Sequence, residues 1–166
     1  MATYHDAITE AQADLIRRAP VFFIATVDPE FENGPDGVGP INLSPKGSSP
    51  LHIISDREVA YLDFRGSGNE TARHTAQGSP ITVMTCSFDS DAAIVRLYGR
   101  ATITALEESP HAARFLDGGT SSILKNRQVI SVQIESTMTS CGYGVPIMDL
   151  VRQRSKEDRG RRFKAV

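Results

Sequence analysis

Short runs of β-branched and aromatic residues recur along most of the chain, separated by intervals rich in Gly, Pro, Asp and Ser. Such runs are typical of strands, and the residues between them supply turn conformations at low cost. The early intervals are too short to contain crossover helices, so we expect consecutive strands to pair antiparallel, as a meander. The pattern predicts strands over residues 21–27, 39–44, 51–55, 59–64, 81–88, 93–106 (bent or bulged at Gly99) and 128–136.

Helical patterns occur in three segments between these runs. Thr9 precedes Gln12 by three residues, which is the spacing of a capping box, and an amphipathic segment follows; this predicts an N-terminal helix. A second helix is expected over residues 69–77. A third is expected over residues 109–117, with Ser109 as its N-cap.

Many short antiparallel strands with a few short helices favour a mainly β fold, a closed or nearly closed barrel, because closure removes unpaired sheet edges. We expect a single domain over residues 1–150, which includes the N-terminal helix. Residues 151–166 shift to dense charge, and we expect them to form a separate tail, either mobile or an exposed helix.

The charge balance narrows the classes of partner. The chain has 18 Lys plus Arg against 20 Asp plus Glu, a formal charge of -2, which gives no general attraction to nucleic acids or membranes. A nucleic-acid-binding small barrel, with Arg96 and Arg100 facing phosphates, stays an alternative, but only 7% of the residues are aromatic and available for base stacking.

Cysteine usage and the N-terminal segment bear on the compartment. Cys86 and Cys141 lack C-x-x-C spacing and so predict neither a disulfide framework nor a zinc site. The N-terminal residues lack the apolar core of a signal peptide, and no apolar run approaches the roughly 20 residues that span a bilayer. We therefore expect a cytoplasmic protein.

The stretch FRGSGNETARH lies where a predicted strand ends and a predicted helix begins. Free backbone N–H groups and the positive end of a helix dipole favour an anion at such a place. Side chains in the stretch add hydrogen-bond donors and positive charge: Arg65, Ser67, Asn69, Thr71 and Arg73. The alternative is that Ser67 or Asn69 merely caps the helix while both arginines are solvated.

Four motifs occur in an order that resembles the pyridoxamine 5'-phosphate oxidase-like family of flavin-binding split barrels. They are INLSPKG at 41–47, VAYLDFRGSGNETARH at 59–74, SPITVMT at 79–85 and RLYGRA at 96–101. The likeness covers roughly residues 20–137. It implies an antiparallel split barrel and an obligate homodimer, with one FMN in each of two clefts at the subunit interface.

The resemblance also implies where the cofactor lies. The FMN phosphate would contact residues 65–73, and the ring system would lie along NLSPKG, with Asn42 and Ser44 as hydrogen-bond donors. Lys46 would lie near the flavin N1 and C2 carbonyl, where a cation stabilises the negative charge of the reduced ring. The alternative for Lys46 is a solvated lysine in a turn.

The segment TMTSCGYGVP at 137–146 follows the last predicted strand. We expect a loop that closes over the flavin, with Cys141, Gly142 and Tyr143 as the residues that contact it; Gly142 permits close approach of the backbone, and Tyr143 stacks or donates a hydrogen bond. An ordinary loop is the alternative. A catalytic role for Cys141 is disfavoured, because nothing in the sequence places a base beside it.

These observations predict an FMN-dependent oxidoreductase that acts on an unidentified small molecule. Authentic pyridoxamine phosphate oxidases carry an Arg-Lys pair where this chain has Asn69 and Glu70, so pyridoxamine phosphate is not the expected substrate. Related barrels accept either FMN or a deazaflavin, and the sequence leaves that choice open. The alternative function is a non-catalytic flavin- or haem-binding protein on the same barrel.

Overall fold

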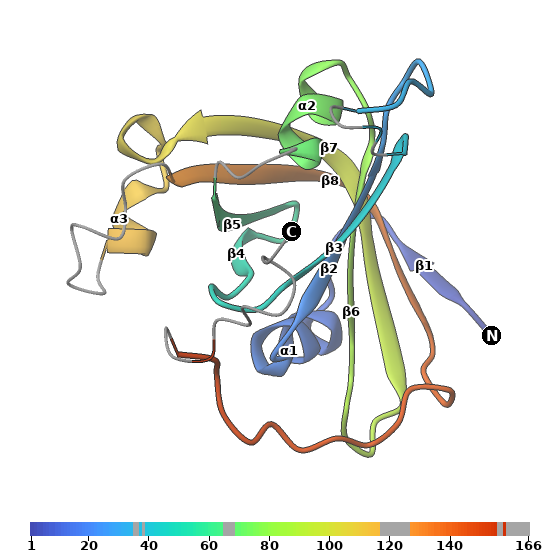
Figure 1. Cartoon of the computed structure of the whole chain (residues 1–166). Helices are drawn as coiled ribbons and strands as arrows, with labels where there is room; N and C mark the ends of the chain where they lie inside the picture. The colour runs from blue at the N-terminus through green and yellow to red at the C-terminus, as the bar shows by residue number, and fades with distance from the viewer. Residues whose placement is uncertain (35–36, 38, 65–68, 117–126, 156–157, 159–166) are drawn as a thin grey trace.

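The computed structural model describes residues 1–34, 37, 39–64, 69–116, 127–155 and 158. The strands of the described chain form one antiparallel sheet, with short helices at its margins (Figure 1). The strands are β1 (Thr3–His5), β2 (Phe22–Val27), β3 (Ile41–Lys46), β4 (His52–Ser55), β5 (Glu58–Phe64), β6 (Ile81–Cys86), β7 (Ala93–Ala105) and β8 (Arg127–Cys141). The helices are α1 (Glu10–Arg18), α2 (Glu70–Ala76) and α3 (Ala112–Leu116), with a 3-10 turn over Leu106–Glu108.

The sheet curls into a barrel that is not closed. Its strand order is β3-β2-β6-β7-β8-β5-β4, and β1 adds to β8 outside this path. Every pairing is antiparallel, as predicted. The expected meander is wrong at two places, because β3 and β4 lie at opposite edges and β5 does not pair with β6. The link from β3 to β4 therefore runs from one edge of the sheet to the other instead of turning back as a hairpin, and Leu51 within this link is buried in the core.

The core fills the barrel with aliphatic and aromatic side chains that alternate along the strands. Phe22 of β2 packs edge-on against Tyr61 of β5, with 5.3 Å between the ring centroids. The predicted N-terminal helix is confirmed as α1, and both halves of its capping box form between Thr9 and Gln12. Figure 1 shows α1 and α2 on opposite sides of the barrel and α3 set apart beside the adjacent ends of β7 and β8.

The bulge predicted in the long seventh strand is confirmed. The register of β7 against β8 shifts between Tyr98 and Gly99. A Cβ atom at Gly99 would lie 1.9 Å from the carbonyl oxygen of Gln133, so only glycine allows the two backbones to approach this closely.

The last strand is longer than predicted. We expected β8 to end at residue 136, but it continues to Cys141, paired with β7 along its length. The reason is that this extension is held by its own contacts with α1: Thr137 is fully buried and donates to Gln12 Oε1 at 3.0 Å, and Thr139 Oγ1 accepts from Gln12 Nε2 at 3.0 Å. Strand β1, which the sequence did not predict, covers this extension.

The start of the third helix also differs from the prediction. Leu106 is buried and begins a 3-10 turn directly after β7, and Ser109 ends that turn by donating its backbone N–H to the Leu106 carbonyl. Helix α3 begins at Ala112, later than predicted. Ser109 still makes cap-like contacts before it, because its Oγ accepts from His111 N–H at 3.2 Å and its carbonyl accepts from Ala112 N–H at 3.0 Å. Among the described residues, no helix combines the length and apolar character needed to cross a bilayer.

Candidate functional site

A pocket of about 270 Å³ opens at the split of the barrel, between β3, β5 and the start of α2. Strand β3 is one edge of the sheet, and β5 lies next to the other edge, so the pocket occupies the gap that closure would have filled. Its lining residues are Ser44, Lys46, Asp63, Phe64, Asn69, Glu70 and Thr71. Four of these were predicted to contact a cofactor, and the fold brings them together: Ser44, Lys46, Asn69 and Thr71.

An ion pair crosses this gap. Lys46 Nζ lies 2.8 Å from Asp63 Oδ1, and the two side chains are only 23% and 13% exposed. The same oxygen accepts the backbone N–H of Phe64 at 2.9 Å. Lys46 is therefore not a freely solvated turn lysine: it is the last residue of β3, held in the pocket by a carboxylate from β5.

Asn42 is buried and lies two residues before Ser44 in β3, on the same face of the strand. Its Nδ2 donates to both Thr26 Oγ1 and Thr71 Oγ1, each at 3.1 Å. Both amide hydrogens are thus used inside the protein, where Asn42 positions Thr71, and the predicted contact of Asn42 with a cofactor stays a prediction. The network continues from Thr26 Oγ1 to His74 Nδ1, 3.0 Å away.

His74 is fully buried at the inner end of this network. Burial lowers its pKa from the ordinary value of 6.5, and the adjacent Arg73 guanidinium adds to that effect. Its Nε2 is 4.0 Å from Asp28 Oδ2 and has no hydrogen-bond partner among the described residues. His74 is therefore a neutral side chain that joins α2 to β2.

Asn69 occupies the N-cap position of α2 in the left-handed conformation, with φ at 44°. Its side chain makes no capping hydrogen bond to the helix. Instead, Asn69 Oδ1 accepts from Gln128 Nε2 at 2.8 Å, which fixes the orientation of the amide. The simple cap is therefore wrong for Asn69, and its Nδ2 group stays available at the pocket.

The two predicted arginines have different outcomes. Arg73 does not line the pocket, because its Nη1 pairs with the buried Asp28 carboxylate at 3.0 Å. The end of its side chain packs against Gly34, where a Cβ would lie closer to Nη2 than atoms can approach. Arg65 and Ser67 lie outside the described residues, so their predicted phosphate contacts stay predictions.

The residues at the end of β8 are not part of the same pocket within one chain. Cys141 is the last residue of a strand that begins at Arg127, and a straight strand of this length spans about 45 Å. Tyr143 is 89% exposed. Gly142 has a structural reason to be glycine, since a Cβ there would lie 2.8 Å from the backbone of Ala92.

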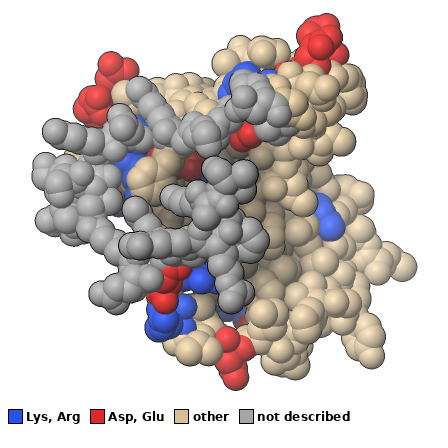
Figure 2. Space-filling model, viewed as in Figure 1, with Lys and Arg blue, Asp and Glu red and all other residues tan. Residues whose placement is uncertain are grey.

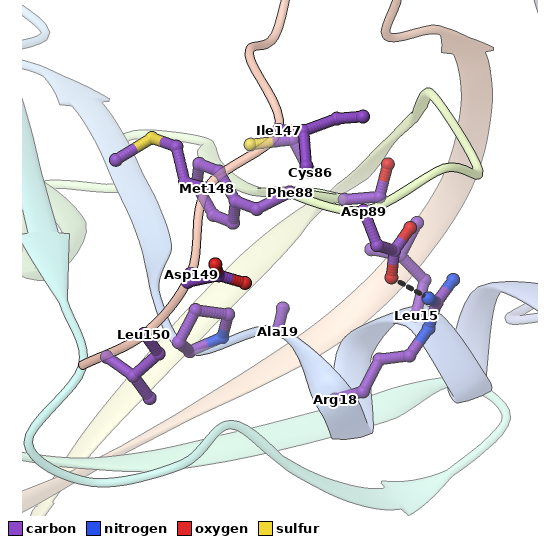
Figure 3. A pocket seen from close by; sticks show the side chains of 12 residues that line it. Leu15, Arg18, Ala19, Cys86, Phe88, Asp89, Ile147, Met148, Asp149 and Leu150 are labelled. Carbon is purple, nitrogen blue, oxygen red and sulfur yellow. Dashed lines mark hydrogen bonds and ion pairs between the residues drawn. The ribbon is translucent and has the colours of Figure 1, made fainter. Parts of the chain in front are cut away.

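A second cavity, of about 260 Å³, lies between the end of α1, the end of β6 and residues 147–150 (Figure 3). Its mouth carries Arg18, which pairs with Asp89, as drawn in Figure 3, and with Asp91. Cys86 lies in its wall, where burial raises the pKa of the thiol and so disfavours a reactive thiolate. None of the predicted cofactor residues lines this cavity.

The described surface carries no metal cluster and no dominant charge on the face that Figure 2 shows. Groups of three or more His, Cys, Asp or Glu residues able to hold a metal ion do not occur among the described residues. In Figure 2, acidic and basic side chains lie near one another in several small groups on the described part of this face.

Sequence reasoning missed three polar residues beside the pocket: Asp63, Gln128 and Arg127. Asp63 shares a strand face with the fully buried Tyr61, and a carboxylate on a buried face is a signal that was present in the sequence. Gln128 and Arg127 became neighbours of Asn69 and Phe64 only through the β5–β8 pairing. The Arg127 guanidinium lies over the Phe64 ring, 2.9 Å from its centroid.

Comparison with known proteins agrees with this architecture. The sequence profile described as "Pyridoxamine 5'-phosphate oxidase" matches residues 8–141. A curated relative from Aspergillus flavus, the pyridoxamine 5'-phosphate oxidase family protein ustO, is 33% identical over 152 residues, covering 90% of this chain and 58% of the relative. The chain thus spans little more than half the length of that relative.

Solved structures show the same fold at low sequence identity. A protein from Lactobacillus delbrueckii, provisionally described as a pyridoxamine 5'-phosphate oxidase, superimposes with a TM-score of 0.59 at 21% identity, covering 80% of this chain and 94% of that one. An F420 reductase superimposes with a TM-score of 0.51 at 16% identity, covering 78% of this chain and 98% of that one.

Proposed function

Because the chain belongs to the pyridoxamine 5'-phosphate oxidase family of flavin-binding split barrels, we propose that it is an FMN-dependent oxidoreductase that acts on a small molecule. The observation that carries the proposal is the pocket at the barrel split, where a partly buried ammonium lies beside hydroxyl and amide groups. This donor set suits a planar ligand that carries carbonyl groups and an anionic substituent.

The residues present fit a flavin as one wall of its site. When bound, FMN supplies the hydride or electron transfer, so the protein itself needs no nucleophile. Lys46 supplies positive charge at the ring, Ser44 and Thr71 supply hydroxyl groups, and Asn69 supplies an amide whose orientation Gln128 fixes. The phosphate is proposed to lie beyond Asn69, near residues 65–68, which are outside the described residues.

The second wall is proposed to come from another copy of the chain. Ile41 and Leu43 are 72% and 67% exposed on the outer face of β3. Strand β3 is also an edge strand whose outer side has no pairing partner among the described residues. An apolar face on an unpaired edge is typical of an interface, and a homodimer would enclose the pocket beside it. A role for Cys141, Gly142 and Tyr143 at the flavin requires this second subunit.

A non-catalytic flavin- or haem-binding protein is the second candidate. Its flavin-binding form is favoured by the described lining of the pocket, in which Lys46 is already paired with Asp63. Its haem-binding form is less favoured, because the described lining residues include no histidine, cysteine or tyrosine to ligate the iron. Such a protein would hold its ligand without turning it over.

Absorbance spectroscopy and mass spectrometry of the purified protein test the proposal directly. We expect a yellow protein that releases FMN on denaturation, and stopped-flow mixing with a nicotinamide donor should bleach the flavin. Bound flavin that no donor reduces would favour the second candidate. A colourless protein that takes up no added FMN would contradict both flavin proposals, and a Soret band would identify haem.

A further inference from the structure

The ion pair across the split presents a donor and an acceptor side by side. Lys46 uses one of its three N–H groups on Asp63 Oδ1. That oxygen also accepts from Phe64, whereas no hydrogen bond to Asp63 Oδ2 is found within the described part of the chain. Lys46 can therefore still donate, and Asp63 can still accept, from inside the same pocket.

The charge of the pocket restricts which part of a ligand fits here. The positive charge of Lys46 is offset by the carboxylate of Asp63, so the pair presents no net positive charge to an anion. A phosphate dianion placed beside this pair would lie against the Asp63 carboxylate, which is unfavourable. A neutral group with both donor and acceptor atoms avoids that repulsion.

We propose that the Lys46–Asp63 pair recognises an imide edge, the CO–NH–CO group of a planar heterocycle. Asp63 accepts the hydrogen bond of the ring N–H, and Lys46 donates to the neighbouring carbonyl. The inference rests on the proposed function, because flavins and deazaflavins share a pyrimidinedione ring with this edge. It makes Asp63 a ligand-binding residue, and it separates the ring end of the pocket from the phosphate end near Asn69.

The two side chains are well placed for selectivity. Both are largely shielded from solvent, so a hydrogen bond made to them is screened less by water than one on the surface. A site built around a shielded carboxylate oxygen also rejects an analogue that lacks the donor, since Asp63 Oδ2 is then left without a hydrogen-bond partner.

The test compares FMN with 3-methyl-FMN, in which a methyl group replaces the ring N3 hydrogen. Quenching of flavin fluorescence gives the Kd of each for the full chain after removal of bound ligand. We expect the wild type to prefer FMN by about tenfold or more, the usual effect of a charge-assisted hydrogen bond. Asp63→Ala should bind FMN more weakly and lose the preference.

Two further variants separate recognition from structure. Lys46→Met should weaken both flavins by a similar factor and keep the preference, because Asp63 remains. Asp14→Ala removes an exposed carboxylate that pairs with Arg17 on α1 and should change neither Kd. If Asp63→Ala does not fold, Asp63→Asn decides, and its preference for FMN should fall several-fold.

Equal affinity of the wild type for both flavins would overturn the inference and leave the proposed function intact. A preference that survives in Asp63→Ala, or that is unchanged in a folded Asp63→Asn protein when Asp63→Ala does not fold, would also overturn it. A wild type that binds neither flavin would overturn the proposed function and this inference together.

Discussion

Lys46 carries its charge in a pocket whose other described ionisable lining groups are acidic, and its Nζ is held by Asp63. A cation at the flavin ring stabilises the reduced, negatively charged form more than the oxidised form. We expect Lys46→Met to lower the midpoint potential of the bound flavin, measured by dye-coupled reductive titration. Arg57→Met, at an exposed position between β4 and β5, is the control and should leave the potential unchanged. An unchanged potential in Lys46→Met would place the lysine away from the ring.

His74 gives a prediction about pH. Burial lowers its pKa in the folded protein below the ordinary 6.5, so the unfolded chain binds the proton first as the pH falls. The contribution of His74 to folding stability is therefore fully present above about pH 6.5 and declines as the pH falls toward the folded pKa. Denaturant midpoints at about pH 7.5 and about pH 5.5 should differ more in the wild type than in His74→Gln. His5→Gln is the control, and an equal loss in all three proteins would show that other groups cause the decline.

The outcomes for individual residues show how much of the candidate site could be predicted from the sequence. Ser44, Lys46, Asn69 and Thr71 were found because their motifs resemble those of a flavin-binding family, and the fold does bring them together. The partners that orient them were not found. Gln128 is 59 residues from Asn69, and Asp63 is 17 residues from Lys46, so each contact depends on strand pairing that no local pattern specifies.

At the scale of elements, β7 depends on one glycine. The bulge brings the Gly99 backbone against Gln133, and a Cβ atom would overlap the carbonyl oxygen. We expect Gly99→Ala to lower the free energy of unfolding by about 2–4 kcal/mol, because β7 and β8 must separate or shift register. Gly144, which has open space around its Cα, is the matched position, and Gly144→Ala should change stability by less than about 0.5 kcal/mol. Denaturant unfolding of both variants measures the difference, and similar values would contradict the role of the bulge.

Elements were predictable where the signal is local. The capping box located α1, and β-branched runs located the strands. Strand β1 was not predicted because three residues show no periodicity, and the strand is defined only by its pairing with β8. The end of β8 was not predicted because glycine and serine near Cys141 are typical of loops. Hydrogen bonds of Thr137 and Thr139 with Gln12 of α1 hold these residues in the strand.

At the scale of the whole molecule, the barrel has two open edges, β3 and β4, and a ligand must be held between them. The pocket lies in the gap between them, and only Lys46 and Asp63 form an ion pair across it within the described chain. Enclosure of a flavin would need additional protein surface, and the apolar outer face of β3 lies beside the gap. Dimerisation and cofactor retention should therefore be linked: loss of one weakens the other by mass action.

Replacement of Leu43 by Glu tests this link. The side chain is 67% exposed and does not support the core, so the variant should keep its β-sheet circular dichroism while a charge prevents apolar contact with a second copy. We expect analytical ultracentrifugation to show a dimer for the wild type and a monomer for Leu43→Glu, with FMN affinity reduced by at least tenfold. Leu116→Glu, on α3, is an exposed apolar position away from β3 and should remain dimeric with its flavin. A Leu43→Glu protein that stays dimeric, or a monomeric wild type that binds FMN tightly, would show that the cleft is complete in one chain and that the face of β3 has another use.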